Sequence, residues 1–291
     1  MILAPLRGVT IRTFRRVFAA PMAEAGFTES VQPFVPAMKG LDPLKDRELS
    51  GGPDEERATP QFIGKDPAAL RECLKRIMDA GWEFADLNCG CPFPMIRKKG
   101  RGSGILKTPD VLARMLEAAC DVMAPGNFSV KTRLGLDTAD ELLSVADVFN
   151  AFPLRRVTIH ARTARQMYEG ECDLAAFRAA ASTMRVPVVY NGDASLDGLA
   201  PGGATYKELG CADVMVGRSF IRSLAVRTDI KPLLSTYIDE SLEELGSERP
   251  VLGRIKELVA YWRDRPEWSR RWGVVKIARS LRELRIALSL R

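Results

Sequence analysis

The sequence has few of the residues that metal centres and disulfide frameworks need. It contains one histidine, and none of its six cysteines is spaced as Cys-x-x-Cys. Structural zinc sites combine several cysteine and histidine ligands at such spacings, so we expect no metal site. The cysteines are scattered through apolar segments, which favours reduced thiols and a cytoplasmic protein.

Long apolar runs are also lacking. No stretch approaches the roughly 18 apolar residues that a membrane-spanning helix needs, so we expect no such helix. Met1 leads directly into the strand-like segment 2–4, so we also expect no signal peptide. The hydrophobic fraction of 46% and the charged fraction of 27% are typical of a globular chain with its own core.

No glycine-rich dinucleotide motif follows the first predicted strand, which argues against a doubly wound nucleotide-binding sheet. Instead, short β-rich runs alternate with amphipathic segments. The eight predicted strands are Ile2–Ala4, Phe27–Ser30, Pro60–Ile63, Phe84–Asn88, Phe128–Thr132, Arg156–His160, Pro187–Asn191 and Ala212–Val216. Eight strands in β/α alternation predict a closed (β/α)8 TIM barrel.

Five amphipathic segments between these strands predict helices: 67–80, 109–123, 139–149, 174–184 and 196–209. The connection 33–59 is long and rich in proline and glycine, which predicts an active-site loop.

Strand signals end after Ser223. Three helices are predicted beyond it, over 230–245, 250–263 and 268–290, and in the last of these Val274 and Ile277 are expected on the buried face. Residues 249–291 hold 12 Lys and Arg against 4 Asp and Glu, a balance of +8, whereas the rest of the chain carries −2. We therefore predict a catalytic barrel domain over 1–225 and a small basic helical domain over 226–291. Its charge indicates either a polyanion partner, nucleic acid first, or a solvated helical face.

Polar residues gather where the predicted strands end, which is where a barrel places its active site. These residues are Pro5, Gln61, Cys91, Lys131, His160, Asn191, Gly192, Asp193, Gly217 and Arg218. The ends of the seventh and eighth strands bind phosphate in many barrels, through glycine amides that approach closely. Asn191-Gly192-Asp193 and Gly217-Arg218 therefore predict a phosphorylated cofactor.

The segment around Cys91 is the most informative part of the chain. An apolar strand stops at Asn-Cys-Gly-Cys-Pro (88–92), and a basic, glycine-rich loop follows it. Four cations lie within ten residues of the thiol: Arg97, Lys98, Lys99 and Arg101. A thiol at a strand end beside a cationic loop indicates chemistry on an anionic substrate, rather than a structural cysteine.

These motifs, in this order, resemble the tRNA-dihydrouridine synthases. The resemblance includes 3–6, 28–29, 61–64, 86–92 with 102–104, 130–135, 160–163 with Gln166, Tyr168 and Gly170, 191–193 and 216–219. It implies an enzyme that uses FMN to reduce the 5,6 double bond of uridine in tRNA, with NADPH, or NAD(P)H more broadly, as reductant.

The resemblance also implies roles for individual residues. Cys91, rather than Cys89, would be the proton donor. The cofactor would be held by Pro5, Leu6, Arg7, Gln61, Lys131, His160, Asn191, Gly192, Asp193, Gly217 and Arg218. RNA contacts are expected from Arg97, Lys98, Lys99, Arg101, Arg162, Lys276, Arg279 and Arg282. No obligate protein partner is indicated.

Two alternatives stay open at this point. One is an FMN barrel that acts on a free pyrimidine or dihydroorotate-like metabolite, which leaves the basic tail without a role. The other is an RNA-binding protein that retains flavin only as a structural relic. Salt-sensitive tRNA binding separates the first alternative from the synthase, and dihydrouridine formation separates the second.

Overall fold

The computed structural model describes residues 1–53 and 58–290, and they form two compact units. The first unit comprises Met1–Ala4 and Thr28–Val216, and the second comprises Pro5–Phe27 and Gly217–Arg291. Segments 5–27 and 217–225 therefore group with the C-terminal helices. The functional division after residue 225 stays a prediction.

The first unit is built on a parallel sheet of ten short strands. They are β1 (Ile2–Leu3), β2 (Glu29–Val31), β3 (Val35–Pro36), β4 (Ala58–Thr59), β5 (Gln61–Ile63), β6 (Ala85–Cys89), β7 (Phe128–Gly135), β8 (Val157–Thr163), β9 (Val188–Asn191) and β10 (Asp213–Val216). Their order is β3-β5-β6-β7-β8-β9-β10-β1-β2-β4.

The sheet closes on itself into a barrel. Pro60 alone separates β4 from β5, so these two strands form one continuous segment, although β4 is the last strand of this order and β5 is the second. Because β4 pairs with β2 and β5 pairs with β6, this segment joins the two ends of the sheet. The predicted (β/α)8 barrel is thereby confirmed, and all eight predicted strands are present.

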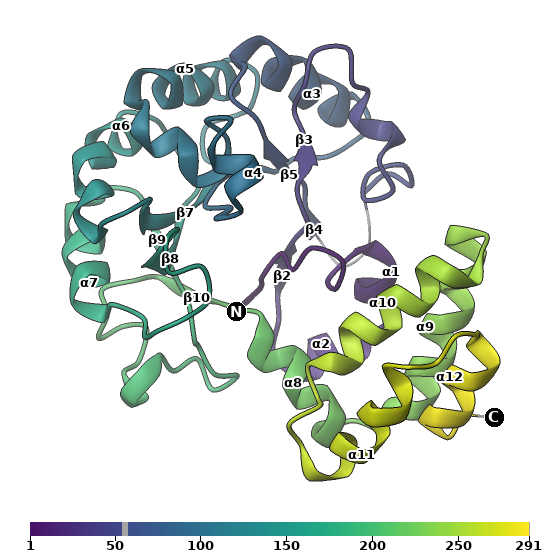
Figure 1. The fold of residues 1–291 in the computed structure, drawn as a ribbon. Helices are drawn as coiled ribbons and strands as arrows, with labels where there is room; N and C mark the ends of the chain where they lie inside the picture. The colour runs from purple at the N-terminus through teal and green to yellow at the C-terminus, as the bar shows by residue number, and fades with distance from the viewer. Residues whose placement is uncertain (54–57, 291) are drawn as a thin grey trace. The chain divides into compact units, whose positions relative to one another are not determined.

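Helices of the first unit surround this ring of strands (Figure 1). They are α3 (Pro67–Asp79), α5 (Pro109–Cys120), α6 (Ala146–Asn150) and α7 (Leu174–Thr183), whereas the short α4 (Pro94–Arg97) lies inside them. Short 3-10 turns are η1 (Pro43–Lys45), η2 (Gly102–Lys107), η3 (Ala139–Glu141), η4 (Leu143–Val145) and η5 (Pro201–Gly203).

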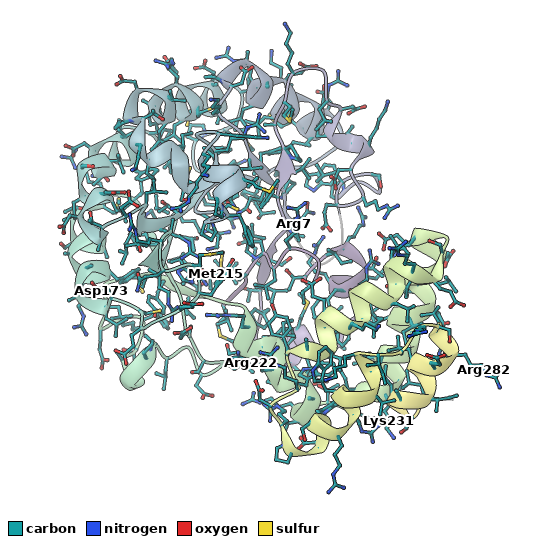
Figure 2. All side chains as sticks on the ribbon, in the orientation of Figure 1. Arg7, Asp173, Met215, Arg222, Lys231 and Arg282 are labelled. Carbon is teal, nitrogen blue, oxygen red and sulfur yellow. The ribbon has the colours of Figure 1, made fainter. Side chains whose placement is uncertain are left out.

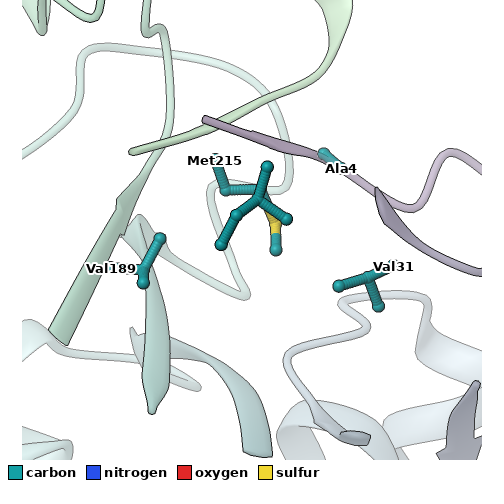
Figure 3. Packing of buried hydrophobic residues seen from close by; sticks show 5 residues of the cluster. Ala4, Val31, Val189 and Met215 are labelled. Carbon is teal, nitrogen blue, oxygen red and sulfur yellow. The ribbon is translucent and has the colours of Figure 1, made fainter. Parts of the chain in front are cut away.

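The barrel interior has an apolar floor. Ile2, Ala4, Val31, Val189 and Met215 are buried together and point toward one another (Figure 3). Side chains alternate between the two faces of a strand, so Asn191, two residues after Val189, also faces the interior. The apolar floor therefore ends where the polar residues of β9 begin.

The second unit is helical. It contains α1 (Arg12–Val17), α2 (Ala19–Glu24), α8 (Arg218–Arg227), α9 (Ile230–Leu245), α10 (Glu248–Ala260), α11 (Pro266–Val275) and α12 (Leu281–Leu288). The rings of Phe14 and Phe18 lie edge-on to Tyr237, at centroid distances of 6.0 and 5.8 Å. This aromatic packing explains why the segment after β1 groups with α9.

Three predictions about local structure were wrong. The predicted helix 196–209 is mostly turns with the 3-10 turn η5, because Pro201-Gly202-Gly203 interrupts it and both glycines have positive φ. The predicted helix 139–149 is broken into η3, η4 and α6. The connection 33–59 is not wholly a loop, since it includes β3 and β4.

A fourth wrong prediction, in the second unit, concerns the tail. The predicted helix 268–290 is two helices, because Ser280 accepts the amide of Glu283 and the Glu283 carboxylate accepts the amide of Arg279. This reciprocal pair is a capping box, which starts a new helix at Leu281. Val274 and Ile277, expected to be buried, are exposed beside this break.

Candidate active site

Buried polar side chains on three neighbouring strands, β7, β6 and β5, form a chain of hydrogen bonds. Ser129 donates to Asp86 at 2.7 Å, Gln61 donates to Asp86 at 2.7 Å, and Asn88 donates to the Gln61 oxygen at 2.8 Å. Burial raises the pKa of Asp86, while the bonds from Gln61 and Ser129 oppose that shift. The chain fixes the orientation of Asn88, since each amide can point only one way.

Asn88 in turn shapes the turn that carries Cys91. Its side-chain oxygen accepts the amides of Gly90 and Cys91, at 3.1 and 2.8 Å. From the other side, the amide and hydroxyl of Ser103 donate to the Cys91 carbonyl, at 3.1 and 2.9 Å. Gly102 has φ +57, and a Cβ there would stand 2.8 Å from the Cys91 Cβ. The thiol turn is thus held by both strand β6 and the glycine loop.

The two cysteines of this turn differ in surroundings. Asp86 and Asn88 belong to the interior hydrogen-bond chain, so Cys89, one residue further along β6, faces the opposite side of the sheet. Cys89 is fully buried, and burial raises the pKa of its thiol well above the usual value. Cys91 is 6% exposed.

Lys131 and Asn191 meet inside the barrel. The Lys131 Nζ donates to the Asn191 Oδ1 at 2.7 Å, and the Asn191 amide donates to the Met215 carbonyl at 2.9 Å. Burial, followed by repulsion from Arg133, lowers the pKa of Lys131 to about 7. A buried amine with so low a pKa is characteristic of functional sites.

His160 lies on the strand between these two residues. In the sheet register it is paired with Arg133 on β7 and with Asn191 on β9. Its ring stands nearly perpendicular to that of Tyr168, at a centroid distance of 6.3 Å. The structure therefore brings Lys131, His160 and Asn191 together on three neighbouring strands, β7, β8 and β9; their roles stay predictions.

Arg133 is a site residue for which the sequence analysis expected no role. Its Nε donates to the Gly90 carbonyl at 2.9 Å, and its Nη1 donates to the carbonyls of Thr163 and Met167 at 3.0 and 2.7 Å. The guanidinium also lies over the Tyr168 ring, 5.2 Å from the centroid. Burial lowers the pKa of Arg133 to about 10. Arg133 thus ties the thiol turn to the loop after β8.

Arg162 is enclosed by protein groups. It is 2% exposed, pairs with Asp193, and donates to the carbonyls of Glu169 and Gly170 at 3.2 and 2.7 Å. These contacts organise the loop after β8 and neutralise the Asp193 carboxylate. Its predicted contact with RNA stays a prediction.

Gly192, between Asn191 and Asp193, has no room for a side chain. A Cβ at this position would stand 2.7 Å from both the Cys172 sulfur and the Tyr190 hydroxyl. Only glycine therefore fits at this strand end, where the sequence predicts a phosphate.

The remaining predicted cofactor residues belong to the second unit. Pro5, Leu6 and Arg7 follow β1, where the Leu6 amide donates to the Thr10 hydroxyl at 2.7 Å. Gly217 directly precedes α8, and its carbonyl accepts the amide of Phe220.

The predicted RNA-binding cations form two sets, one in each unit. Arg97, Lys98, Lys99 and Arg101 lie on and after α4, and the Arg101 guanidinium reaches the Met38 sulfur at 3.7 Å. Lys276, Arg279 and Arg282 are exposed, and Figure 2 shows Arg282 pointing away from its helix.

In residues 1–53 and 58–290, no group of three or more His, Cys, Asp or Glu side chains is arranged to hold a metal ion. In the same part of the chain, no helix combines the length and apolarity that crossing a bilayer requires.

Known structures share this fold. Morphinone reductase in complex with tetrahydroNAD superimposes with a TM-score of 0.52 at 11% identity, covering 76% of this chain and 83% of that one. The old yellow enzyme from Trypanosoma cruzi gives a TM-score of 0.53 at 10% identity, covering 76% and 85%. At such low identity the likeness supports the barrel fold alone.

Curated relatives are more similar in sequence. The tRNA-dihydrouridine synthases B of Vibrio vulnificus and Vibrio cholerae are 30% and 31% identical over 224 and 222 residues. Both matches cover 75% of this chain and 66% of the relative, so the chain spans just under two thirds of their length. The tRNA-dihydrouridine(16) synthase of Pasteurella multocida is 32% identical over 162 residues, covering 54% of this chain and 51% of that protein.

The family model described as dihydrouridine synthase matches residues 2–239, which includes every strand of the barrel. The chain belongs to the dihydrouridine synthase family.

Proposed function

We propose that this protein is an FMN-dependent tRNA-dihydrouridine synthase, which reduces the 5,6 double bond of a uridine in tRNA with NADPH as reductant. Family membership supports the reaction class. The observation that carries the proposal is the Asn88 carboxamide, which holds the Cys91 turn next to the polar barrel interior.

The residues of the first unit fit the phosphate end of FMN. At Gly192 there is no space for a side chain, so only glycine allows the backbone to pass here. Turns that bind phosphate through backbone amides require such a glycine. The Asp193 carboxylate is paired with Arg162, so its charge is compensated and does not repel a phosphate. Asn191, Gly192 and Asp193 would hold this end, and the predicted phosphate contacts of Gly217 and Arg218 stay predictions for the second unit.

The ring end of the cofactor fits the interior polar groups. Gln61 uses one of its two amide hydrogens in the hydrogen-bond chain, and Lys131 and His160 lie on the neighbouring strands β7 and β8. The backbone contacts predicted for Pro5, Leu6 and Arg7 belong to the second unit and stay predictions. When bound, FMN would supply the hydride for carbon 6 of uracil.

Cys91 would supply the proton for carbon 5. A thiol with an ordinary pKa of about 8.5 is mostly protonated at neutral pH and can act as an acid. Asn88 and Ser103 fix the backbone on both sides of this residue, so the sulfur has a defined position. Cys89 faces the other side of β6 and would take no part.

Lys131 would balance negative charge on the cofactor. Its pKa of about 7 means that the amine is partly neutral while the site lacks an anion. An anion placed beside it favours the charged form, so we expect Lys131 to be protonated when the flavin ring is reduced and carries negative charge.

The cations of both units would hold tRNA phosphates. The exposed side chains Lys276, Arg279 and Arg282, with the loop 97–101, give the charge that a polyanion needs. A free pyrimidine carries no such backbone, so these cations favour tRNA over the metabolite alternative.

A reconstituted reaction tests the proposal. Purified protein, FMN and NADPH are incubated with tRNA from cells that lack this protein, and dihydrouridine is measured by mass spectrometry. We expect dihydrouridine at a defined tRNA position, with kcat/KM falling steeply as salt rises. A flavin-loaded protein that reduces free pyrimidines but not tRNA would overturn the proposal, as would tRNA binding without any reduction.

A further inference from the structure

Two large apolar side chains are exposed immediately after the Cys91 turn. Met95, in α4, is 79% exposed, and Phe93, which precedes this helix, is 45% exposed. Met95 has the largest exposed fraction recorded for a large apolar residue in the described part of the chain. Surface apolar residues are common when single, but such a pair beside a reactive thiol indicates an interaction site.

The structure fixes these side chains relative to the thiol. The turn η2 packs against Cys91 on one side, where Gly102 leaves no room for a Cβ. On its other side η2 meets α4, because a Cβ at Gly104 would collide with the Arg97 carbonyl. Cys91, η2 and α4 therefore form one packed group, and Figure 1 shows α4 inside the ring of outer helices.

Positive charge surrounds the two apolar residues. Arg97, Lys98, Lys99 and Arg101 follow in the chain, and Lys65 approaches the same loop, since its side chain would stand 3.5 Å from a Cβ at Gly100. A second copy of this protein is a poor partner for this surface, because two such cationic loops would repel each other. A polyanion with flat apolar groups, which is what RNA offers, complements both features.

We infer that Met95 is a wedge that fills the space left in a tRNA base stack when the target uridine leaves it, with Phe93 stacking on a neighbouring base. This inference rests on the proposed function. Cys91 is almost fully buried, so a uridine reaches it only by leaving its stack. Apolar side chains such as Met and Phe serve as wedges between bases in other nucleic-acid-binding proteins.

A wedge makes a prediction that a simple contact does not. It lowers the cost of unstacking, so it matters for a folded tRNA and has little effect on a short single-stranded RNA whose uridine is already free. For Met95→Ala we expect kcat/KM to fall about tenfold or more on folded tRNA, and less than about twofold on the short RNA. Met95→Leu keeps the apolar volume and should restore activity on both.

Two control variants separate this effect from others. Met78→Ala removes an exposed methionine on α3 and should leave kcat/KM unchanged on both RNAs. Lys98→Ala removes a proposed phosphate contact. It should weaken the binding of both RNAs and reduce the salt dependence of that binding. Equal losses on both RNAs in Met95→Ala, or no loss on either, would overturn the wedge.

A second measurement does not depend on reduction. Acylation of the tRNA 2′-hydroxyls in the complex reports nucleotides that have left their stack. We expect the wild type to raise reactivity beside the target uridine, and Met95→Ala to remove most of this increase. An unchanged pattern contradicts the wedge. Absence of dihydrouridine with the wild type would contradict the proposed function alone.

Discussion

The Nζ of Lys131 lies 2.7 Å from the Oδ1 of Asn191, two strands away across the barrel. The hydrogen bond does not compensate the burial of this amine, since the pKa of Lys131 is lowered to about 7. This pair therefore makes the site sensitive to pH near neutrality.

Binding of reduced FMN should weaken as pH rises above about 7, because the protonated form of Lys131 is the form that pairs with the anionic reduced ring. Anaerobic titration of the flavin-free protein with reduced FMN gives the dissociation constant at several pH values. In Lys131→Met we expect weaker binding and a much flatter pH profile. A wild-type profile that stays flat from about pH 6 to 8 would contradict this role.

The same residue links stability to pH. The unfolded amine has a pKa of about 10.4, so between about pH 7 and 10 the unfolded state holds more protons than the folded state. The free energy of unfolding of the flavin-free protein should therefore gain a favourable contribution as pH rises through this window. Lys131→Met should lack this pH dependence. Its free energy of unfolding should exceed that of the wild type most at or below pH 7, as urea unfolding at two pH values would show.

Asn88→Ala should loosen the Cys91 turn while leaving the barrel folded. Two backbone amides lose their acceptor, so we expect kcat to fall by about tenfold to a hundredfold, with a smaller change in tRNA affinity. The alkylation rate of Cys91, followed by mass spectrometry, gives a readout independent of turnover. Unchanged kcat and unchanged alkylation would show that Asn88 does not position the thiol.

Arg162 and Arg282 should behave differently. Arg162→Ala removes the guanidinium that donates to two backbone carbonyls and pairs with Asp193. We therefore expect the free energy of unfolding to fall by about 2 kcal/mol and flavin binding to weaken. Arg282→Ala should keep the melting temperature and reduce the salt slope of tRNA binding by about 1. A lowered salt slope in Arg162→Ala at unchanged stability would restore the sequence-based assignment of Arg162 to RNA.

Gly192→Ala should be destabilising by about 1–3 kcal/mol, because its methyl group would overlap the Cys172 sulfur and the Tyr190 hydroxyl. Gly253→Ala is the matched control. Gly253 lies within α10 with no atom near its Cβ position, so alanine should be neutral or stabilising by up to about 1 kcal/mol. Comparable urea midpoints for the two variants would contradict the tight packing at Gly192.

The barrel was predictable because buried parallel strands have continuous apolar runs with a clear end. Val157-Thr158-Ile159 is one such run, and the end of this strand predicted His160 as a candidate site residue. The breaks in the outer helices were harder to predict. Pro201-Gly202-Gly203 and the capping box at Ser280 are short local signals that override a helical period.

The candidate site was predicted only in part. Strand ends predicted that Lys131, His160 and Asn191 lie together, and the structure places them so, while their roles stay predictions. Arg133 was given no role, although its alternation with Lys131 along β7 places both on one face. The contacts of Tyr168 depend on how the loop after β8 folds, and no sequence period encodes that.

The most direct test compares the two cysteines of the β6 turn. Cys91→Ala and Cys89→Ala are loaded with FMN and assayed for dihydrouridine in tRNA, with flavin and tRNA binding measured in parallel. We expect Cys91→Ala to bind both and to lose at least about a hundredfold in kcat, and Cys89→Ala to remain close to the wild type. Equal activities in the two variants would contradict the assignment of Cys91 as the proton donor.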